Sequence, residues 1–309
     1  MDRIYDLIII GCGPAGLTAA IYAVRAGLSF LLLEGAYAPG GQAANTGVIE
    51  NYPGLPGIQG SELSEAMARQ AEGLGASITE AEVAGIELLP EGVKRVCCRD
   101  AKAYEAKAVV IASGTSHRRL GVPGEEELEG CGVSYCAVCD GAFFRGRTAV
   151  VVGGGNTAAD DAVFLAGICK EVKLIHRRDT LRADRILQER LRALENVALI
   201  LNATVEEICG DGAVEAVLVR NKTDGTVSRM KTDAVFAAVG TEPQTEWCRG
   251  LLDMDPVGYI RAGEDCATNI PGIFVAGDVR TKKLRQIVTA VSDGACAIKS
   301  VQEYLNAWS

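Results

Sequence analysis

The sequence has few aromatic residues, only two histidines and no long hydrophobic run. Its 309 residues include 6 Phe, 2 Trp and 2 His. No apolar stretch approaches the roughly 20 residues that a membrane-spanning helix needs. The first apolar run, Leu7 to Ile10, is too short for a secretory signal, and no cleavage site follows it. These absences predict a cytoplasmic protein with no membrane segment.

A surplus of positive charge is absent as well. The 40 acidic residues outnumber the 31 basic ones, which gives a formal net charge of −9. An acidic surface repels the phosphate backbone of nucleic acids and anionic lipid headgroups. We therefore expect no nucleic-acid partner and no membrane binding.

The 11 cysteines do not form the dense framework of a small secreted protein. Their number is odd and, apart from Cys136 and Cys139, they are scattered, whereas disulfide scaffolds are shorter and richer in cysteine. A reducing compartment fits this pattern better. Most of the thiols, such as Cys12 and Cys296, are expected to be buried as small apolar side chains.

Glycine is abundant, and it marks a turn that suits a nucleotide. The 36 glycines and 48% hydrophobic residues fit an α/β protein of about two domains. The first apolar run ends in a turn with Gly11, Gly13 and Gly16, and a helical segment follows, so a helix N-terminus can face a pyrophosphate. The next apolar run, residues 30–33, ends in Glu34, whose carboxylate can accept hydrogen bonds from a ribose diol.

A second copy of this pattern begins near residue 149. Its small-residue positions are Gly153, Gly155 and Ala158, and its next strand ends at His176. The spacing from the last small residue to the end of that strand is the same in both copies. One such turn matches many unrelated loops, but two in the same register are hard to obtain by chance. The chain is therefore predicted to hold two dinucleotide-binding units.

The two copies differ at the end of the second strand. Where the first copy has Glu34, the second has His176, followed by Arg177, Arg178 and then Arg182. A carboxylate suits a free ribose 2′-hydroxyl and repels a 2′-phosphate, whereas guanidinium groups bind phosphate through charge-assisted contacts. We expect the first copy to hold the AMP half of FAD or NAD, and the second to hold NADPH. A solvated charged face is the alternative interpretation of the arginines.

Three further apolar runs indicate how the units are joined. Residues 109–115 and 235–241 follow the two turns and end in small residues, where the chain would cross between units. Residues 272–278 end in Gly277 and Asp278 at the edge where α/β sheets bind ligands, and Asp278 can accept a hydrogen bond from a polyol. The expected fold class is α/β, with two Rossmann-like, three-layer ββα dinucleotide-binding domains, the second inserted into the first.

The crossing points set the expected boundaries. Residues 1–116 and 246–309 would form the FAD-binding domain, and residues 117–245 the inserted NADPH-binding domain. The crossings near 116–118 and 242–245 would make a two-strand hinge.

Cys136 and Cys139 form a CxxC pair directly before Asp140, upstream of the second turn. A disulfide between them would accept two electrons, and its attacking sulfur must be a thiolate. Asp140 is placed to handle the proton. We predict catalytic roles for all three residues.

Two metal sites are alternative interpretations of this pair, but we predict no resident metal. Zinc would need a second pair of ligands, but no second CxxC exists and neither histidine is near in sequence. Cys131, Cys136 and Cys139 have the spacing of a plant-type iron–sulfur site, with Cys169 as a possible fourth ligand. Cys169 follows the second nucleotide turn and the other three cysteines precede it, so the four ligands would have to come together across that turn.

Taken together, these segments resemble the low-molecular-weight, bacterial and archaeal type of NADPH-dependent thioredoxin reductase, a group of flavoprotein disulfide reductases. The likeness extends from Asp6 to the final helix. It is carried by the segments Gly11 to Gly16, Gly40 to Gln42, Glu50 to Gly54, Cys136 to Asp140, Gly153 to Ala158, His176 to Arg182, Ala276 to Asp278 and Arg285 to Ile287.

The resemblance implies two sets of cofactor-binding residues. Those for FAD would be Gly11, Gly13, Gly16, Glu34, Gly41, Gln42, Asn51, Gly277, Asp278, Gln286 and Ile287. Those for NADPH would be Gly153, Gly155, Asn156, Thr157, His176, Arg177, Arg178 and Arg182.

The resemblance also implies the reaction and the partner. Hydride would pass from NADPH to FAD and on to the Cys136–Cys139 disulfide. Cys136 would then attack oxidised thioredoxin, Cys139 would face the flavin, and Asp140 would handle the proton. Members of this group are homodimers whose NADPH domain rotates against the FAD domain during turnover.

Two departures from the group's pattern are visible, and three other functions stay open. Val138 stands where threonine is common, and the aromatic pair Phe143 and Phe144 begins one position later than is usual on the surface that receives thioredoxin. The alternatives are a flavin-dependent dithiol oxidase, a reductase of another thioredoxin-like protein, and a non-catalytic FAD/NADPH redox sensor. The arginine cluster argues against the oxidase, and the CxxC pair argues against a ferredoxin–NADP⁺ reductase.

Overall fold

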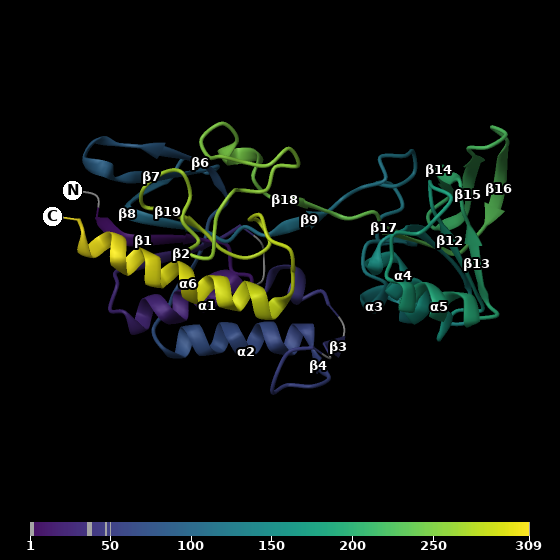
Figure 1. Cartoon of the computed structure of the whole chain (residues 1–309), viewed down its shortest axis with the longest axis horizontal. Coiled ribbons are helices and arrows are strands. Elements are labelled where there is room, and N and C mark those ends of the chain that lie inside the picture. Colours follow the sequence, from purple (N-terminus) through teal and green to yellow (C-terminus); the bar gives the residue numbers. More distant parts are fainter. Residues whose placement is uncertain (1–2, 36–38, 47, 50, 309) are drawn as a thin grey trace. The chain divides into compact units, whose positions relative to one another are not determined.

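The chain folds into two compact units, shown in a computed structural model (Figure 1). The structure describes residues 3–35, 39–46, 48–49 and 51–308, without the side chains of Val48 and Cys139. The first unit comprises Met1–Ser116 and Glu242–Ser309, and the second comprises His117–Thr241.

The return to the first unit comes earlier than the sequence-based boundary at 245. Strands β9 (Thr115–His117) and β18 (Thr241–Pro243) pair with each other at the two crossings. Directly after β18, Gln244 belongs to the first unit: its backbone N–H donates to the Gly114 carbonyl at 3.0 Å, and its carbonyl accepts from Ser113 Oγ at 2.9 Å.

The first unit is built on a sheet whose parallel strands have the order β5–β2–β1–β8–β19. Their bounds are β1 Ile4–Ile10, β2 Phe30–Glu34, β5 Ile78–Glu80, β8 Ala103–Ile111 and β19 Ile273–Val275. Along β1, Leu7 and Ile9 pack into one core while Ile8 and Ile10 pack into another. Both faces of the sheet are therefore covered, which explains the continuous apolar runs.

Helices cover one face of this sheet. An antiparallel pair of strands packs against the hydrophobic core on the other face. The helices are α1 Pro14–Arg25, α2 Gly60–Gly73 and α6 Ile287–Asn306, and the pair is β6 Val83–Leu88 with β7 Lys94–Cys98. A short hairpin, β3 Val48–Ile49 with β4 Ile58–Gln59, precedes α2. Helix α6 approaches α1 closely because Gly294 has no side chain: a Cβ there would lie 2.3 Å from the Ala15 carbonyl oxygen.

The second unit repeats this plan, with a parallel sheet in the order β13–β12–β11–β17–β10. Its sheet strands are β10 Val133–Ser134, β11 Thr148–Gly153, β12 Glu171–Ile175, β13 Val197–Ile200 and β17 Ala234–Ala238. Its helices are α3 Ala137–Asp140, α4 Asn156–Ala166 and α5 Arg185–Ala193, and its antiparallel layer is β14 Ala203–Gly210, β15 Val214–Asn221 and β16 Val227–Lys231. Val151 faces the helix-side core, and Val150 faces the core under the antiparallel layer.

Corresponding strands thus have the same spatial order in the two units. The outermost strand, however, lies at a different place in the sequence of each unit. In the first unit that strand is β19, near the end of the chain, whereas in the second it is β10, at the start of the inserted segment. The prediction of two Rossmann-like, three-layer units with one inserted into the other is confirmed. Within the described residues, no helix combines the length and hydropathy needed to cross a membrane.

Lys94 is a charged side chain in the core of the first unit. Lys94 is 2% exposed, and its ammonium donates to the Lys107 carbonyl and to Tyr304 Oη, each at 2.8 Å. The same nitrogen lies 4.8 Å from the ring centre of Tyr304 and 5.4 Å from that of Trp308. Burial lowers the pKa of Lys94 to about 8. Lys94 therefore contacts residues at the C-terminal end of α6, and the free-energy cost of burying its charge depends on pH.

We expect the wild type to gain stability relative to Lys94→Met as the pH rises from about 8 to about 10.4. The folded-state pKa of Lys94 lies below its unfolded value, so the unfolded chain binds more protons in this window and deprotonation favours folding. The gain should be about 1–3 kcal/mol. Urea denaturation of both proteins at about pH 7 and about pH 10 measures it.

The matched control is Lys102→Met, which alters an exposed lysine of the same region. The difference in free energy of unfolding between Lys102→Met and the wild type should not change between about pH 8 and about pH 10.4. Parallel pH dependence of the wild type and Lys94→Met would contradict the assignment.

Candidate functional site

Cys136 is disulfide-bonded and lies directly before the short helix α3. Its backbone N–H donates to Ser134 Oγ at 3.0 Å, and its carbonyl accepts from the backbone N–H of Asp140 at 3.2 Å. These contacts fix Cys136 and Asp140 on one turn. Cys139 lies in that turn, but its side chain is outside the described part, so its pairing with Cys136 stays a prediction.

The two aromatic residues after this turn have different surroundings. Phe143 is 78% exposed, whereas Phe144 packs edge-on against Phe236 with ring centres 5.9 Å apart. Of these two rings, Phe143 is therefore the one that offers an apolar surface beside the turn.

In the first unit the glycine turn leads into α1 without a side-chain cap. Gly13 is the N-cap residue, and a Cβ built on it would meet no atom within 4 Å. Gly16 allows the turn to close, since a Cβ there would lie 1.7 Å from the Gly11 carbonyl oxygen. No atom of the described residues fills the space beside Gly13 at this helix N-terminus, which suits an anionic group.

Several loops of the first unit meet at this turn. Glu34 Oε2 accepts a hydrogen bond from the Cys12 backbone N–H at 2.6 Å, so the carboxylate at the end of β2 lies against the turn. A Cβ on Gly41 would lie 3.5 Å from Gly13 Cα, and one on Gly277 would lie 2.9 Å from the Ala15 side chain. The loops that the sequence assigned to FAD therefore reach the start of α1.

Two amide side chains connect the remaining predicted residues. Asn51 Nδ2 donates to Gln286 Oε1 at 2.8 Å, at the N-terminus of α6, where Ile287 begins the helix. Gln42 Nε2 donates to the Thr115 carbonyl at 2.6 Å. Thr115 was not among the predicted residues, because its role follows from a contact with a loop far away in sequence.

Asp278 carries an unused hydrogen-bonding atom. Its Oδ1 is buried and has no partner among the residues that the structure describes. Burial raises the pKa of this carboxyl above its usual range. Since buried polar atoms are nearly always paired, this oxygen calls for a ligand donor such as a hydroxyl.

The turn of the second unit likewise begins an uncapped helix. Gly155 is the N-cap of α4 and has no side-chain cap, and a Cβ on it would meet no atom within 4 Å. Asn156 and Asp184 hold each other: Asn156 Nδ2 donates to Asp184 Oδ2, and the Asp184 backbone N–H donates to Asn156 Oδ1, both at 2.8 Å. Thr157 is exposed on the first turn of α4. Sequence reasoning missed Asp184, which has no motif of its own.

The three predicted arginines are exposed and available. Arg177, Arg178 and Arg182 follow β12, and their guanidinium groups form no ion pair with the carboxylates that the structure describes. All three lie close enough to His176 to lower its pKa, together with the larger effect of burial. The loop therefore concentrates three guanidinium groups that form no ion pair within the described part of the chain.

His176 has a different position from its counterpart Glu34. It is 5% exposed and lies beneath the turn, where a Cβ on Gly154 would be 2.2 Å from the imidazole ring. Its Nε2 has no partner within the described part of the chain. A direct contact between His176 and NADPH stays a prediction, whereas its packing under Gly154 is observed.

The expectation that Cys12 and Cys296 are both buried is wrong for Cys296. Cys12 is fully buried, but Cys296 lies on the exposed side of α6. Cys169 is buried, and its thiol donates to the Phe144 carbonyl at 3.5 Å. Within the described residues, no group of three or more histidine, cysteine or acidic side chains is arranged to hold a metal ion.

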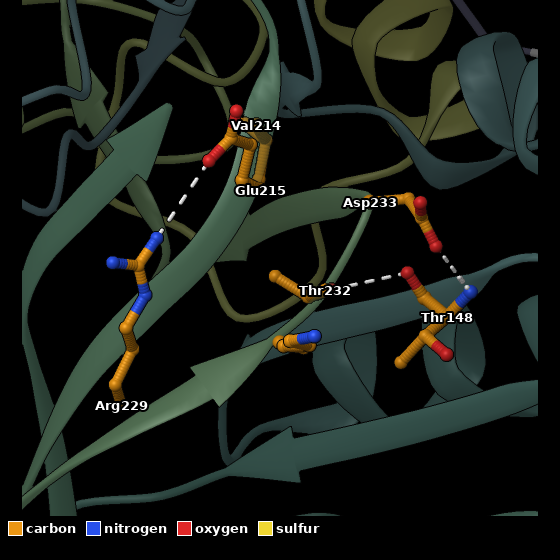
Figure 2. A pocket seen from close by; sticks show the side chains of 7 residues that line it. Thr148, Val214, Glu215, Arg229, Thr232 and Asp233 are labelled. Carbon is orange, nitrogen blue, oxygen red and sulfur yellow. Dashed lines mark hydrogen bonds and ion pairs between the residues drawn. The ribbon is translucent and has the colours of Figure 1, made fainter. Parts of the chain in front are cut away.

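Figure 2 shows the residues that line a cavity of about 520 Å³ in the second unit. Its lining includes Thr148, the first residue of β11, whereas the glycine turn begins at the last residue of that strand, Gly153. The polar groups of the cavity are largely satisfied by one another. Arg229 pairs with Glu215 at 3.7 Å, and the Thr148 backbone N–H donates to Asp233 at 2.9 Å, as Figure 2 shows. It takes no part in the candidate site.

Comparison with known proteins identifies the family. Residues 5–294 match the family described as pyridine nucleotide-disulphide oxidoreductase. The chain belongs to this family.

Similar family members are thioredoxin reductases. The chain is 48% identical to the thioredoxin reductase of Listeria innocua over 98% of this chain and 95% of that protein. The Lactococcus lactis thioredoxin reductase structure has a TM-score of 0.89 at 43% identity, covering 98% of this chain and 99% of the other. The T. acidophilum thioredoxin reductase structure has a TM-score of 0.86 at 37% identity and covers 100% of both chains.

The residues of this family member fit two dinucleotides. The first unit has an uncapped helix N-terminus, a carboxylate at the end of β2, and the Oδ1 of Asp278, which is buried without a partner among the described residues. The second has a similar helix N-terminus beside exposed arginines, where the first has a carboxylate. The contrast favours a free ribose in the first unit and a 2′-phosphate in the second.

Proposed function

We propose that this chain is a thioredoxin-disulfide reductase that uses FAD and NADPH. The observation that carries the proposal is a disulfide-bonded Cys136, next to Asp140, in the second of two dinucleotide-type units. Near-full-length similarity to thioredoxin reductases supports it. The steady-state test is NADPH consumption with oxidised thioredoxins from several sources, and no consumption with any of them would favour a redox sensor instead.

The proposed division of labour follows the two units. The first unit holds FAD around the α1 N-terminus and Asp278, and the second holds NADPH with the α4 N-terminus and the arginines after β12. When bound, the two cofactors supply a pair of electrons to the disulfide of Cys136.

The chain's own residues then perform the exchange. Reduction breaks the Cys136–Cys139 bond, and the Cys136 thiolate attacks one sulfur of the thioredoxin disulfide to form a mixed disulfide. Cys139 attacks Cys136, which releases dithiol thioredoxin and restores the original bond. Asp140 accepts and returns the proton that Cys139 exchanges in these steps. Exposed Phe143 provides an apolar contact for a protein partner.

The double variant Arg177→Ala/Arg178→Ala should raise KM for NADPH at least about tenfold, which is ~1.4 kcal/mol of binding. KM for NADH should change little, because NADH lacks the 2′-phosphate that the guanidinium groups contact. Initial rates at varied concentrations of both nucleotides measure the effect.

The control is Arg185→Ala, since Arg185 is exposed on α5 and pairs with Glu189. It should leave both constants unchanged. Equal weakening of NADPH and NADH in the double variant would count against the phosphate assignment. Oxygen consumption with a small dithiol and no nucleotide would favour a dithiol oxidase instead.

We further propose a cytoplasmic homodimer. The nine cysteines that the structure gives as free thiols support a reducing compartment. Light scattering of the purified protein should give twice the 32.5 kDa chain mass.

A further inference from the structure

A loop of the first unit is fixed to one face of α6 by two contacts that flank Cys296. Cys266 Sγ donates to the Asp293 carbonyl at 3.5 Å, and Ser300 Oγ donates to the Asp265 carbonyl at 2.7 Å. Positions three and four apart share one face of a helix, so Asp293, Cys296 and Ser300 lie in a row. Cys296 therefore lies between the two points where the loop meets the helix.

Helix geometry allows the Cys296 thiol to approach an atom that Cys266 already contacts. A short polar side chain in a helix can turn back to the carbonyl three or four residues earlier, which for Cys296 includes that of Asp293. Cys266 Sγ already contacts that carbonyl. The two sulfurs also interact electrostatically: burial raises the pKa of Cys266 to about 12, and the charges of Asp293 and Cys296 add to the rise.

The two cysteines differ in exposure and in backbone conformation. Cys266 is fully buried, whereas Cys296 is exposed. Cys266 also has a φ of 60°, in the left-handed region that residues other than glycine seldom adopt. Such strained residues cluster at functional and switching positions.

We propose that Cys266 and Cys296 form a second redox-active dithiol, which a hydroperoxide oxidises to a disulfide independently of Cys136. The exposed Cys296 thiolate attacks the peroxide O–O bond, which yields a sulfenic acid and releases hydroxide or an alkoxide. The Cys266 thiol then attacks the Cys296 sulfur, so that an S–S bond forms, the S–O bond breaks and water leaves with the Cys266 proton. The pair loses two electrons to one peroxide, and a small dithiol reverses the bond by exchange.

A disulfide between Cys266 and Cys296 would also affect the contacts of the Gly277 loop, one of the segments predicted to bind FAD. Asp293, whose carbonyl Cys266 touches, accepts a hydrogen bond from the Gly277 backbone N–H at 2.9 Å. The proposal does not depend on thioredoxin reduction, since its chemistry needs only these two thiols and a peroxide.

Peptide mapping of the full-length protein tests the proposal directly. Trypsin places the two cysteines in separate peptides, residues 262–280 and 286–299, each with one cysteine. Reduced protein is treated with hydrogen peroxide, blocked with N-ethylmaleimide and digested without reductant. We expect the two peptides to be linked, lighter than their sum by two hydrogen atoms, and separated again by dithiothreitol. The same result is expected in a Cys136→Ser/Cys139→Ser background.

Single variants separate the role of Cys296, which attacks the peroxide, from that of Cys266, which then attacks the Cys296 sulfur. Cys266→Ala should leave Cys296 as a sulfenic acid that reacts with dimedone, and Cys296→Ser should abolish the linked peptide while thioredoxin reduction persists. Cys131→Ser, which removes another exposed cysteine, should leave the linked peptide unchanged. The proposal is overturned if both peptides carry maleimide after peroxide, or if residues 286–299 link only to a second copy of themselves.

Discussion

Replacing Cys139 with serine should abolish thioredoxin reduction and leave FAD bound. Serine has no sulfur to form the proposed disulfide with Cys136, so electrons have no acceptor on the chain and a mixed disulfide with thioredoxin cannot be resolved. The turnover rate should fall at least about a thousandfold, because residues that act as a unit fail together. Steady-state NADPH oxidation with oxidised thioredoxin measures the loss, and flavin absorbance shows that the cofactor is retained and still bleached by NADPH.

The same variant gives a second readout. Cys136, freed from its disulfide, should form a stable adduct with thioredoxin that a gel without reductant detects. Cys131→Ser is the matched control, because Cys131 is an exposed cysteine five positions before Cys136, and it should keep full activity. Undiminished turnover in Cys139→Ser would rule out the proposed mechanism.

Replacing Asp293 with asparagine should destabilise the first unit by about 3–5 kcal/mol, the usual cost of leaving buried charges unpaired. Asp293 is 5% exposed and accepts hydrogen bonds from Arg280 at 2.7 and 2.8 Å and from Lys282 at 2.7 Å. Asparagine keeps the shape but removes the negative charge between two buried cations. Urea denaturation followed by circular dichroism measures the loss.

The control and the pH dependence sharpen this prediction. Glu65→Gln breaks an ion pair with Arg69 that is 3.0 Å long but mostly exposed, and it should cost at most about 1 kcal/mol. Burial alone would raise the pKa of Asp293, but the hydrogen bonds from Arg280 and Lys282 outweigh it and the pKa is lowered. The contribution is therefore present above the unfolded pKa of about 3.9 and is lost as the pH falls through the folded value. Equal losses for Asp293→Asn and Glu65→Gln would contradict the buried-pair account.

The repeat of strand, glycine turn and helix could be predicted because each element is local in sequence. An apolar run, small residues and a charged strand end lie within one segment, and both copies fold as that order indicates. Gly11 and Gly155 therefore lie where the pattern placed them.

The remaining details depend on packing that the sequence does not show. His176 shares its register with Glu34 but turns beneath Gly154, since a glycine there leaves room for the ring. Cys296 and the buried Ala297 are neighbours, and only the packing of α6 decides which of them faces solvent. Asp293 supports the Gly277 loop through contacts between distant segments, for which no motif exists.

The insertion also sets an order of assembly during synthesis. The first unit begins at the N-terminus, yet its sheet needs β19 and its helical layer needs α6, which end at Val275 and Asn306. The second unit is one continuous segment, His117–Thr241, and is complete well before either of them leaves the ribosome. Since domains generally fold as units during translation, the unit that starts first is the last to close its core.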